Sequence, residues 1–153
     1  MPYKVVMKTL TAQPVIFKRA DVNISEIGEA LAQILPSVFQ YVQDNGLTFA
    51  GPPFARYVAF GPGKATIEAG MPIAEKAAPN GEFQTGSLPA GPAATTIHTG
   101  DYQKLSDAHA AVETWISEQT LAVGGAPWEW YVDDPTDFPN GDWKTEIIWP
   151  LTN

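Results

Sequence analysis

Two glutamates stand inside apolar, aromatic segments near the C-terminus. Glu129 lies in WEWY (128–131), and Glu146 lies in TEIIW (145–149). Both segments have the composition of β-strands, where glutamate is disfavoured and where burying a charge is costly. A carboxylate kept between aromatic side chains would attract a cation, or would serve as a general acid or base. We therefore take both glutamates as candidate site residues; the alternative for each is a glutamate on the solvent face of its strand.

Three tyrosines have the chemistry to complete such a site. Tyr131 follows the first glutamate by two residues, Tyr102 precedes a predicted helix, and Tyr57 lies in a matching strand of the first half. Their rings can stack on a planar ligand, and their hydroxyls can donate hydrogen bonds. The same residues also suit an ordinary core, but we expect Tyr102 and Tyr131 to line a cleft.

Side-chain alternation along a strand sorts these residues into faces. Glu129 and Tyr131 are expected on one face of their strand, and Glu146 and Ile148 on one face of the last strand. Four tryptophans are then expected opposite the two acids, packed under the helices: Trp128, Trp130, Trp143 and Trp149.

Other chemistries find little support. The chain has no cysteine, which excludes disulfides and thiolate metal sites. His98 and His109 are eleven residues apart, and no third ligand stands at metal spacing near them. We predict that both histidines are structural or surface residues and that the protein uses no metal and no cofactor.

The elements that must position the candidates follow from periodicity and turn signals. Asn23 or Ser25 is expected to cap the first helix, Pro36 to kink or restart it, and Asp101 to cap the second. The predicted helices cover 24–44 and about 18 residues from 101, and the predicted strands cover 3–10, 14–20, 54–60, 65–73, 82–88, 92–99, 128–133 and 143–151.

An internal repeat organises these elements. Pro14 and Pro92 open matching strands 78 positions apart, and Glu68 and Glu146 sit in matching final strands at the same spacing. We therefore predict one α+β domain of two βαββ repeats, about 1–78 and 79–153. The repeats would be related by a pseudo-twofold axis, with a helix on each antiparallel sheet and a ligand cleft between them. Glu68 is a weaker third candidate.

The length, hydrophobic content and net charge of the chain limit the kinds of partner that it can bind. The chain has 153 residues, 44% of them hydrophobic, and a net charge of −8. This suits a single domain and argues against non-specific binding to nucleic acid or to an anionic membrane. The sequence carries no run of 18 apolar residues and no apolar leader, so we expect a cytoplasmic protein. Because two repeats would already complete a pseudo-dimer, we expect it to be a monomer or weak dimer.

The chain resembles the GyrI-like small-molecule-binding domains, which also form the effector-binding half of MerR-type multidrug-responsive activators. The matching segments are HTGDYQKLSDAHAAVETWI (98–116), PWEWYVDDP (127–135) and WKTEIIWPL (143–151), with looser matches in AGPPFARYVAF and IEAGMPI. No helix-turn-helix segment precedes Pro2, so direct gene regulation is not expected.

The resemblance implies a duplicated βαββ fold whose central groove takes bulky, often cationic, aromatic compounds. It places Glu129 facing the ligand, Glu146 as a second pocket acid, and Tyr102 and Tyr131 as pocket aromatics. Our first hypothesis is a binding module for such compounds. The second is a hydrolase of cyclopropane-bearing genotoxins that uses Glu129 as a general base, and the third is a protein-interaction role such as gyrase inhibition.

Overall fold

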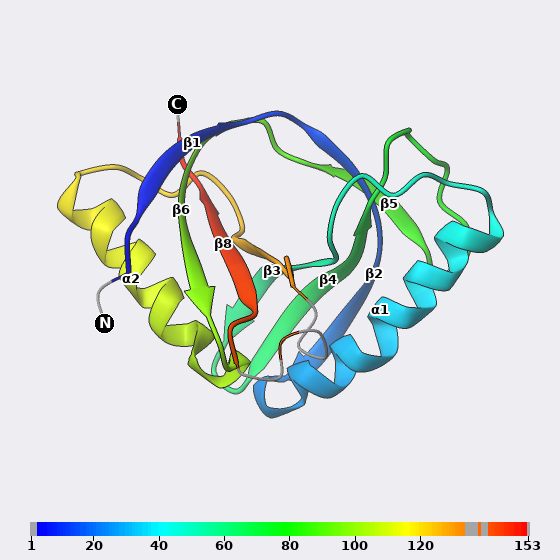
Figure 1. The fold of residues 1–153 in the computed structure, drawn as a ribbon, viewed down its shortest axis with the longest axis horizontal. Coiled ribbons are helices and arrows are strands. Elements are labelled where there is room, and N and C mark those ends of the chain that lie inside the picture. The colour runs from blue at the N-terminus through cyan, green and yellow to red at the C-terminus, as the bar shows by residue number, and fades with distance from the viewer. Residues whose placement is uncertain (1–2, 134–137, 139–140, 153) are drawn as a thin grey trace. The chain divides into compact units, whose positions relative to one another are not determined.

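The computed structural model describes residues 3–133, 138 and 141–152, and these form two compact units. The N-terminal unit is Ala12–Pro89, and the C-terminal unit combines Met1–Thr11 with Ala90–Asn153. Both units pair antiparallel strands with one helix (Figure 1). None of the described helices is long and apolar enough to cross a membrane.

The N-terminal unit is a four-stranded antiparallel sheet in the order β3-β4-β2-β5, and α1 packs against β2 and β4. Its core is made where Val38 and Val42 of α1 meet Ile16 of β2 and Met71 at the end of β4. The elements are β2 (Gln13–Asn23), α1 (Ile27–Asp44), β3 (Phe54–Gly61), β4 (Lys64–Pro72) and β5 (Gln84–Leu88).

The start of α1 differs from the predicted one. A short 3-10 turn, Ile24–Glu26, precedes the helix, and neither Asn23 nor Glu26 makes a side-chain capping bond. Asn23 instead donates from Nδ2 to the Glu26 carboxylate at 2.6 Å. The helix runs on through Pro36, so of the predicted kink or restart, the restart was wrong and the kink stays a prediction; tertiary packing of the apolar stripe outweighs the lost backbone donor.

The C-terminal unit has the strand order β1-β6-β8-β7, with α2 against β6 and β8. The apolar stripe of α2 is buried where Ala108, Val112 and Ile116 meet Ile147 of β8. The elements are β1 (Val6–Leu10), β6 (Gly91–Thr99), α2 (Leu105–Glu118), β7 (Trp128–Trp130) and β8 (Lys144–Pro150), with a 3-10 turn at Tyr102–Lys104.

The outer strands divide the chain differently from the predicted repeats. β1 was predicted in the first repeat but pairs with β6 of the C-terminal unit. β5 was predicted in the second repeat but pairs with β2 of the N-terminal unit. The chain therefore changes unit after Thr11 and again after Pro89. β7 also ends at Trp130, three residues before the predicted end, and most of the polar loop expected after it (134–137 and 139–140) lies outside the described residues.

Gly70 marks the closest approach inside the N-terminal sheet. A Cβ atom at Gly70 would lie 2.0 Å from the carbonyl oxygen of Ile16 and 2.7 Å from Cα of Phe17. Both atoms belong to the backbone of the paired strand β2, so they cannot move aside without disturbing the ladder. Only glycine fits this position.

We expect Gly70→Ala to lower the free energy of unfolding by about 1–3 kcal/mol, because the added methyl group overpacks the β2–β4 ladder. Gly28→Ala is the matched control: it lies in α1, has no atom within 4 Å of an added Cβ, and should stabilise by at most about 1 kcal/mol. Chemical denaturation of both variants measures their free energies of unfolding. A Gly70→Ala variant as stable as Gly28→Ala would contradict the close approach.

Candidate functional site

Glu129 sits in the middle of β7 and is buried, with a relative exposure of 2%. It pairs across the ladder with Ile147 of β8, and Ile147 belongs to the core beneath α2. Directly paired residues of antiparallel strands project to the same face. The Glu129 side chain therefore lies on the face of the sheet that α2 covers.

Both carboxylate oxygens of Glu129 have a partner. His109 of α2 places Nε2 2.7 Å from Oε2, and the Tyr131 hydroxyl donates to Oε1 at 2.7 Å. A buried carboxylate needs such hydrogen bonds to offset its lost hydration. Helix α2 and the end of β7 thus hold Glu129 from two sides.

The chain of contacts continues into β8. The indole Nε1 of Trp149 donates to Nδ1 of His109 at 3.0 Å, and the two rings lie at 68° with centroids 5.9 Å apart. We call these four residues, Trp149, His109, Glu129 and Tyr131, the Glu129 network. All four belong to the C-terminal unit, so one unit positions the whole network.

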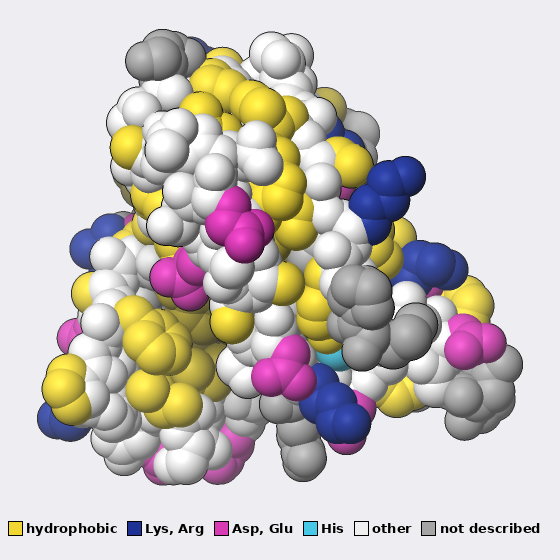
Figure 2. Space-filling view, turned by 90° about the vertical axis from the view of Figure 1, so that its left-hand side faces the viewer, with side chains coloured by type: hydrophobic (Ala, Val, Ile, Leu, Met, Phe, Trp, Pro, Cys, Tyr) yellow, Lys and Arg dark blue, Asp and Glu magenta, His cyan; other side chains and the backbone are white. Residues whose placement is uncertain are grey.

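Aromatic rings extend the network toward solvent. Tyr102 meets Tyr131 edge to face, with ring centroids 5.7 Å apart, and meets Trp143 in the same way at 6.0 Å. Tyr102 is 39% exposed, whereas the His109 side chain is only 17% exposed. On the face drawn in Figure 2, histidine shows only as a small area among other side chains. The structure thus places Tyr131 against Glu129 and Tyr102 against Tyr131, while their role as walls of a cleft stays a prediction.

Glu146 and Ile148 lie on the opposite face of the same sheet. Glu146 pairs with Trp130 and Ile148 with Trp128, and neither pair shares the face of Glu129. The Glu146 carboxylate accepts an exposed hydrogen bond and ion pair from Lys8 of β1, while Ile148 is buried.

The predicted placement of the tryptophans opposite both acids was therefore wrong. The paired register puts Glu129 and Glu146 on different faces, so any tryptophan opposite one acid lies beside the other. Trp149 contacts the Glu129 side through His109, while Trp128 and Trp130 lie on the Glu146 side.

The first-half candidates lie in the N-terminal unit. Tyr57 pairs with Ile67, and its ring meets Phe60 edge to face at 6.1 Å. Glu68 is buried and forms a salt bridge with Arg19. The hydrogen bond from Arg19 to the Glu68 carboxylate raises the pKa of Arg19. Glu68 is therefore paired with a cation of its own unit, and its role in a site stays a prediction.

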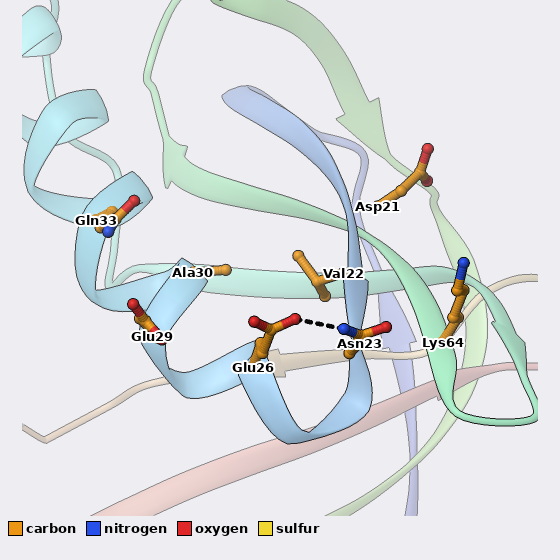
Figure 3. Close-up of a pocket in the computed structure, with 8 residues that line it drawn as sticks. All are labelled: Asp21, Val22, Asn23, Glu26, Glu29, Ala30, Gln33 and Lys64. Atoms are coloured by element: carbon orange, nitrogen blue, oxygen red, sulfur yellow. Dashed lines mark hydrogen bonds between the residues drawn. The ribbon is translucent and has the colours of Figure 1, made fainter.

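The N-terminal unit also has a shallow hollow of about 310 Å³ at the start of α1 (Figure 3). Acidic and amide side chains from β2 and α1 surround it, with one lysine from β4. In the described part of the chain, no group of three or more His, Asp or Glu side chains is arranged to hold a metal ion. The lining residues are Asp21, Val22, Asn23, Glu26, Glu29, Ala30, Gln33 and Lys64.

Sequence reasoning missed His109 and Trp149 as site residues. His109 was predicted to be structural or surface, yet it contacts the candidate carboxylate directly. A signal was present: His109 stands four residues after Leu105 and three before Val112, within the buried stripe of α2. A polar residue in a buried stripe indicates a buried polar partner.

Solved structures share this fold across the full chain. The C-terminal domain of EcmrR matches with a TM-score of 0.87 and 24% identity, covering 100% of this chain and 99% of that one. In the complex of EcmrR with DNA the match has a TM-score of 0.85 and 23% identity, and it covers 99% of this chain and 58% of that EcmrR chain.

Two more distant structures carry informative names. SAV2435 bound to tetraphenylphosphonium matches with a TM-score of 0.58 and 14% identity, covering 100% of this chain and 95% of that one. A hydrolase from Listeria innocua matches with a TM-score of 0.67 and 12% identity, covering 99% and 93%. At these identities the likeness shows the fold alone.

No curated protein matches the sequence. The family model for the GyrI-like small molecule binding domain matches residues 3–152. This match spans nearly all of the chain, including every residue of the Glu129 network. The protein therefore belongs to the family of GyrI-like small molecule binding domains.

Proposed function

We propose that the protein binds hydrophobic, aromatic cations and that the carboxylate of Glu129 is the charged anchor. The observation that carries this proposal is a carboxylate with 2% exposure whose two oxygens are held by His109 and Tyr131. Removing a carboxylate from water costs several kcal/mol even after relaxation, so a sequence retains one where it serves structure or function. A cation in a low-dielectric site interacts with it far more strongly than at the surface.

The aromatic residues beside Glu129 suit the same class of ligand. Tyr131 touches both the carboxylate and Tyr102, which is partly exposed. Tyrosine faces attract cations and stack on planar groups, so we assign Tyr102 and Tyr131 to the wall that contacts the ligand. The net charge of −8 favours the approach of a cation over that of an anion.

The comparisons support the ligand class. The family is one of small molecule binding domains, and the related SAV2435 structure contains tetraphenylphosphonium, a hydrophobic aromatic cation. We adopt tetraphenylphosphonium as the probe for this chain. Because Glu146 lies on the face of the sheet opposite Glu129, this proposal gives it no contact with the ligand, contrary to the prediction from the sequence. Roles for Tyr57 and Ile148 in binding, and a cytoplasmic location, stay predictions.

We also propose that the two units descend from one duplicated βαββ ancestor. Val15 pairs with Pro72 in the N-terminal sheet, and Ala93 pairs with Pro150 in the C-terminal sheet, 78 positions later in both strands. The outer strands keep this spacing. Gln13 pairs with Leu88 in the N-terminal sheet, and Gly91 pairs with Leu10 in the C-terminal sheet, so both partners again differ by 78 positions. Matching registers support a common origin; the pseudo-twofold axis and the cleft between repeats stay predictions.

Hydrolysis is the second candidate, and the bond between His109 and Glu129 favours it. A carboxylate fixed by a neighbouring side chain suits a general base that activates water. Incubation with an electrophilic cyclopropane compound, followed by mass spectrometry, separates the candidates. We expect stoichiometric binding without product; turnover that disappears in Glu129→Gln would establish the hydrolase instead. A gyrase-inhibitor role stays a prediction.

The proposed anchor predicts a specific loss of binding. We expect Glu129→Gln to weaken tetraphenylphosphonium binding by about 1–3 kcal/mol, or roughly 5- to 150-fold, because it removes the charge while keeping the side-chain shape. Isothermal titration calorimetry of the full chain measures the dissociation constant.

Glu146→Gln is the matched control. It makes the same chemical change on the opposite face of the sheet, where Lys8 already offsets the charge, so its dissociation constant should stay within about threefold of the original. An unchanged affinity in Glu129→Gln, or an equal loss in both variants, would remove Glu129 from the binding site.

A further inference from the structure

We infer that Trp149 is a positioning residue that holds His109 in its neutral form, so that His109 does not become a cation beside Glu129. The juxtaposition that carries this inference is the indole Nε1 of Trp149 at 3.0 Å from Nδ1 of His109, whose Nε2 lies 2.7 Å from Glu129. The consequence for ligands rests on the proposed function, whereas the protonation of His109 does not.

The hydrogen-bonding rules of the two rings decide the tautomer. An indole N–H is a donor only, so Nδ1 of His109 must present its lone pair to Trp149. A neutral imidazole has a single N–H, which therefore sits on Nε2. His109 thus donates to Oε2 of Glu129 as a neutral group.

Protonation of His109 would break this arrangement. A second proton on Nδ1 would point at the indole N–H, so the hydrogen bond would be replaced by a contact between two donors. The titratable groups facing His109 include Glu129 from β7 and, behind it, Tyr131; on α2 itself, the exposed Glu113 lies four residues on. These acids favour a charged imidazole, and the Trp149 N–H opposes it.

The neutral form has a consequence for binding. An imidazolium within hydrogen-bond distance of Glu129 would offset the carboxylate charge, and an incoming cation would then meet a neutral pair. An ordinary histidine gains its charge between about pH 8 and pH 5. With Trp149 in place, His109 adds no opposing charge beside Glu129.

His98 shows what makes the tryptophan special. Its Nε2 donates to the carbonyl oxygen of Asp101 at 2.8 Å, and its Nδ1 accepts from the Tyr3 hydroxyl at 2.8 Å. That hydroxyl can turn and accept instead, because a phenol is both donor and acceptor. Protonation of His98 therefore loses no hydrogen bond, whereas protonation of His109 does.

Nitrogen-15 NMR of the histidine side chains in the full chain tests the inference directly. The chain has two histidines, so His109→Gln assigns both sets of signals. We expect His109 to carry its single proton on Nε2, with none on Nδ1. In Trp149→Phe, which keeps an aromatic ring and removes the donor, protonated His109 should appear at a higher pH than in the unaltered protein. Trp115→Phe, in the same core, is the control and should leave His109 neutral.

Ligand binding supplies the second arm. We expect the dissociation constant for tetraphenylphosphonium to be flat between pH 8 and about 5.5 in the unaltered protein. In Trp149→Phe it should rise by about tenfold as the pH falls, since His109 then gains a charge beside Glu129. Trp149→Phe combined with His109→Gln should restore a flat profile, because glutamine donates to Glu129 without titrating.

The outcomes separate the two ideas. A proton on Nδ1 of His109, or the same titration of His109 with and without the indole, overturns the inference; the unaltered protein alone decides the tautomer even if Trp149→Phe does not fold. A neutral His109 together with a pH-independent Trp149→Phe variant overturns the link to binding. Affinity that is unaffected by Glu129→Gln overturns the proposed function while the assignment of His109 stands.

Discussion

The buried carboxylate of Glu129 depends on two hydrogen bonds, one to each oxygen. His109 reaches it from α2 and Tyr131 from the residue after β7, so a charge that would otherwise oppose folding is held by neutral donors. These bonds constrain the surrounding elements: α2 must present His109 toward the sheet, and β7 must keep its register with Ile147 of β8. The adjacent aromatic residue Tyr102 then packs edge to face against Tyr131.

Register is the means by which the fold separates the acids of the C-terminal unit. Because Glu129 pairs with Ile147, the next pair along the ladder, Trp130 with Glu146, must project to the other face. One acid is therefore held in the layer between sheet and helix, and the other reaches Lys8 at a more exposed position. Similar residues in neighbouring strands thus have different environments, which makes them a matched pair for experiment.

Much of the architecture could be predicted from the sequence. Periodicity and turn residues located the two helices and eight strands of the described residues to within a few positions, and the aromatic context singled out Glu129 and Tyr131. The rest depends on contacts distant in sequence. Which face of β8 packs on α2, and which strand β1 joins, are set by pairing across the fold. The buried stripe of α2 indicates that His109 has a buried polar partner but not which one, since its partners are 20 and 40 positions away.

The most direct measurement is a crystal structure of the protein with tetraphenylphosphonium bound. If Glu129 is the anchor, the phosphonium centre will lie within about 6 Å of its carboxylate, with at least one phenyl group against Tyr102 or Tyr131. A cation bound elsewhere, with the hydrogen bonds from His109 and Tyr131 to Glu129 unchanged and no ligand atom near them, would show that the buried carboxylate only supports the fold.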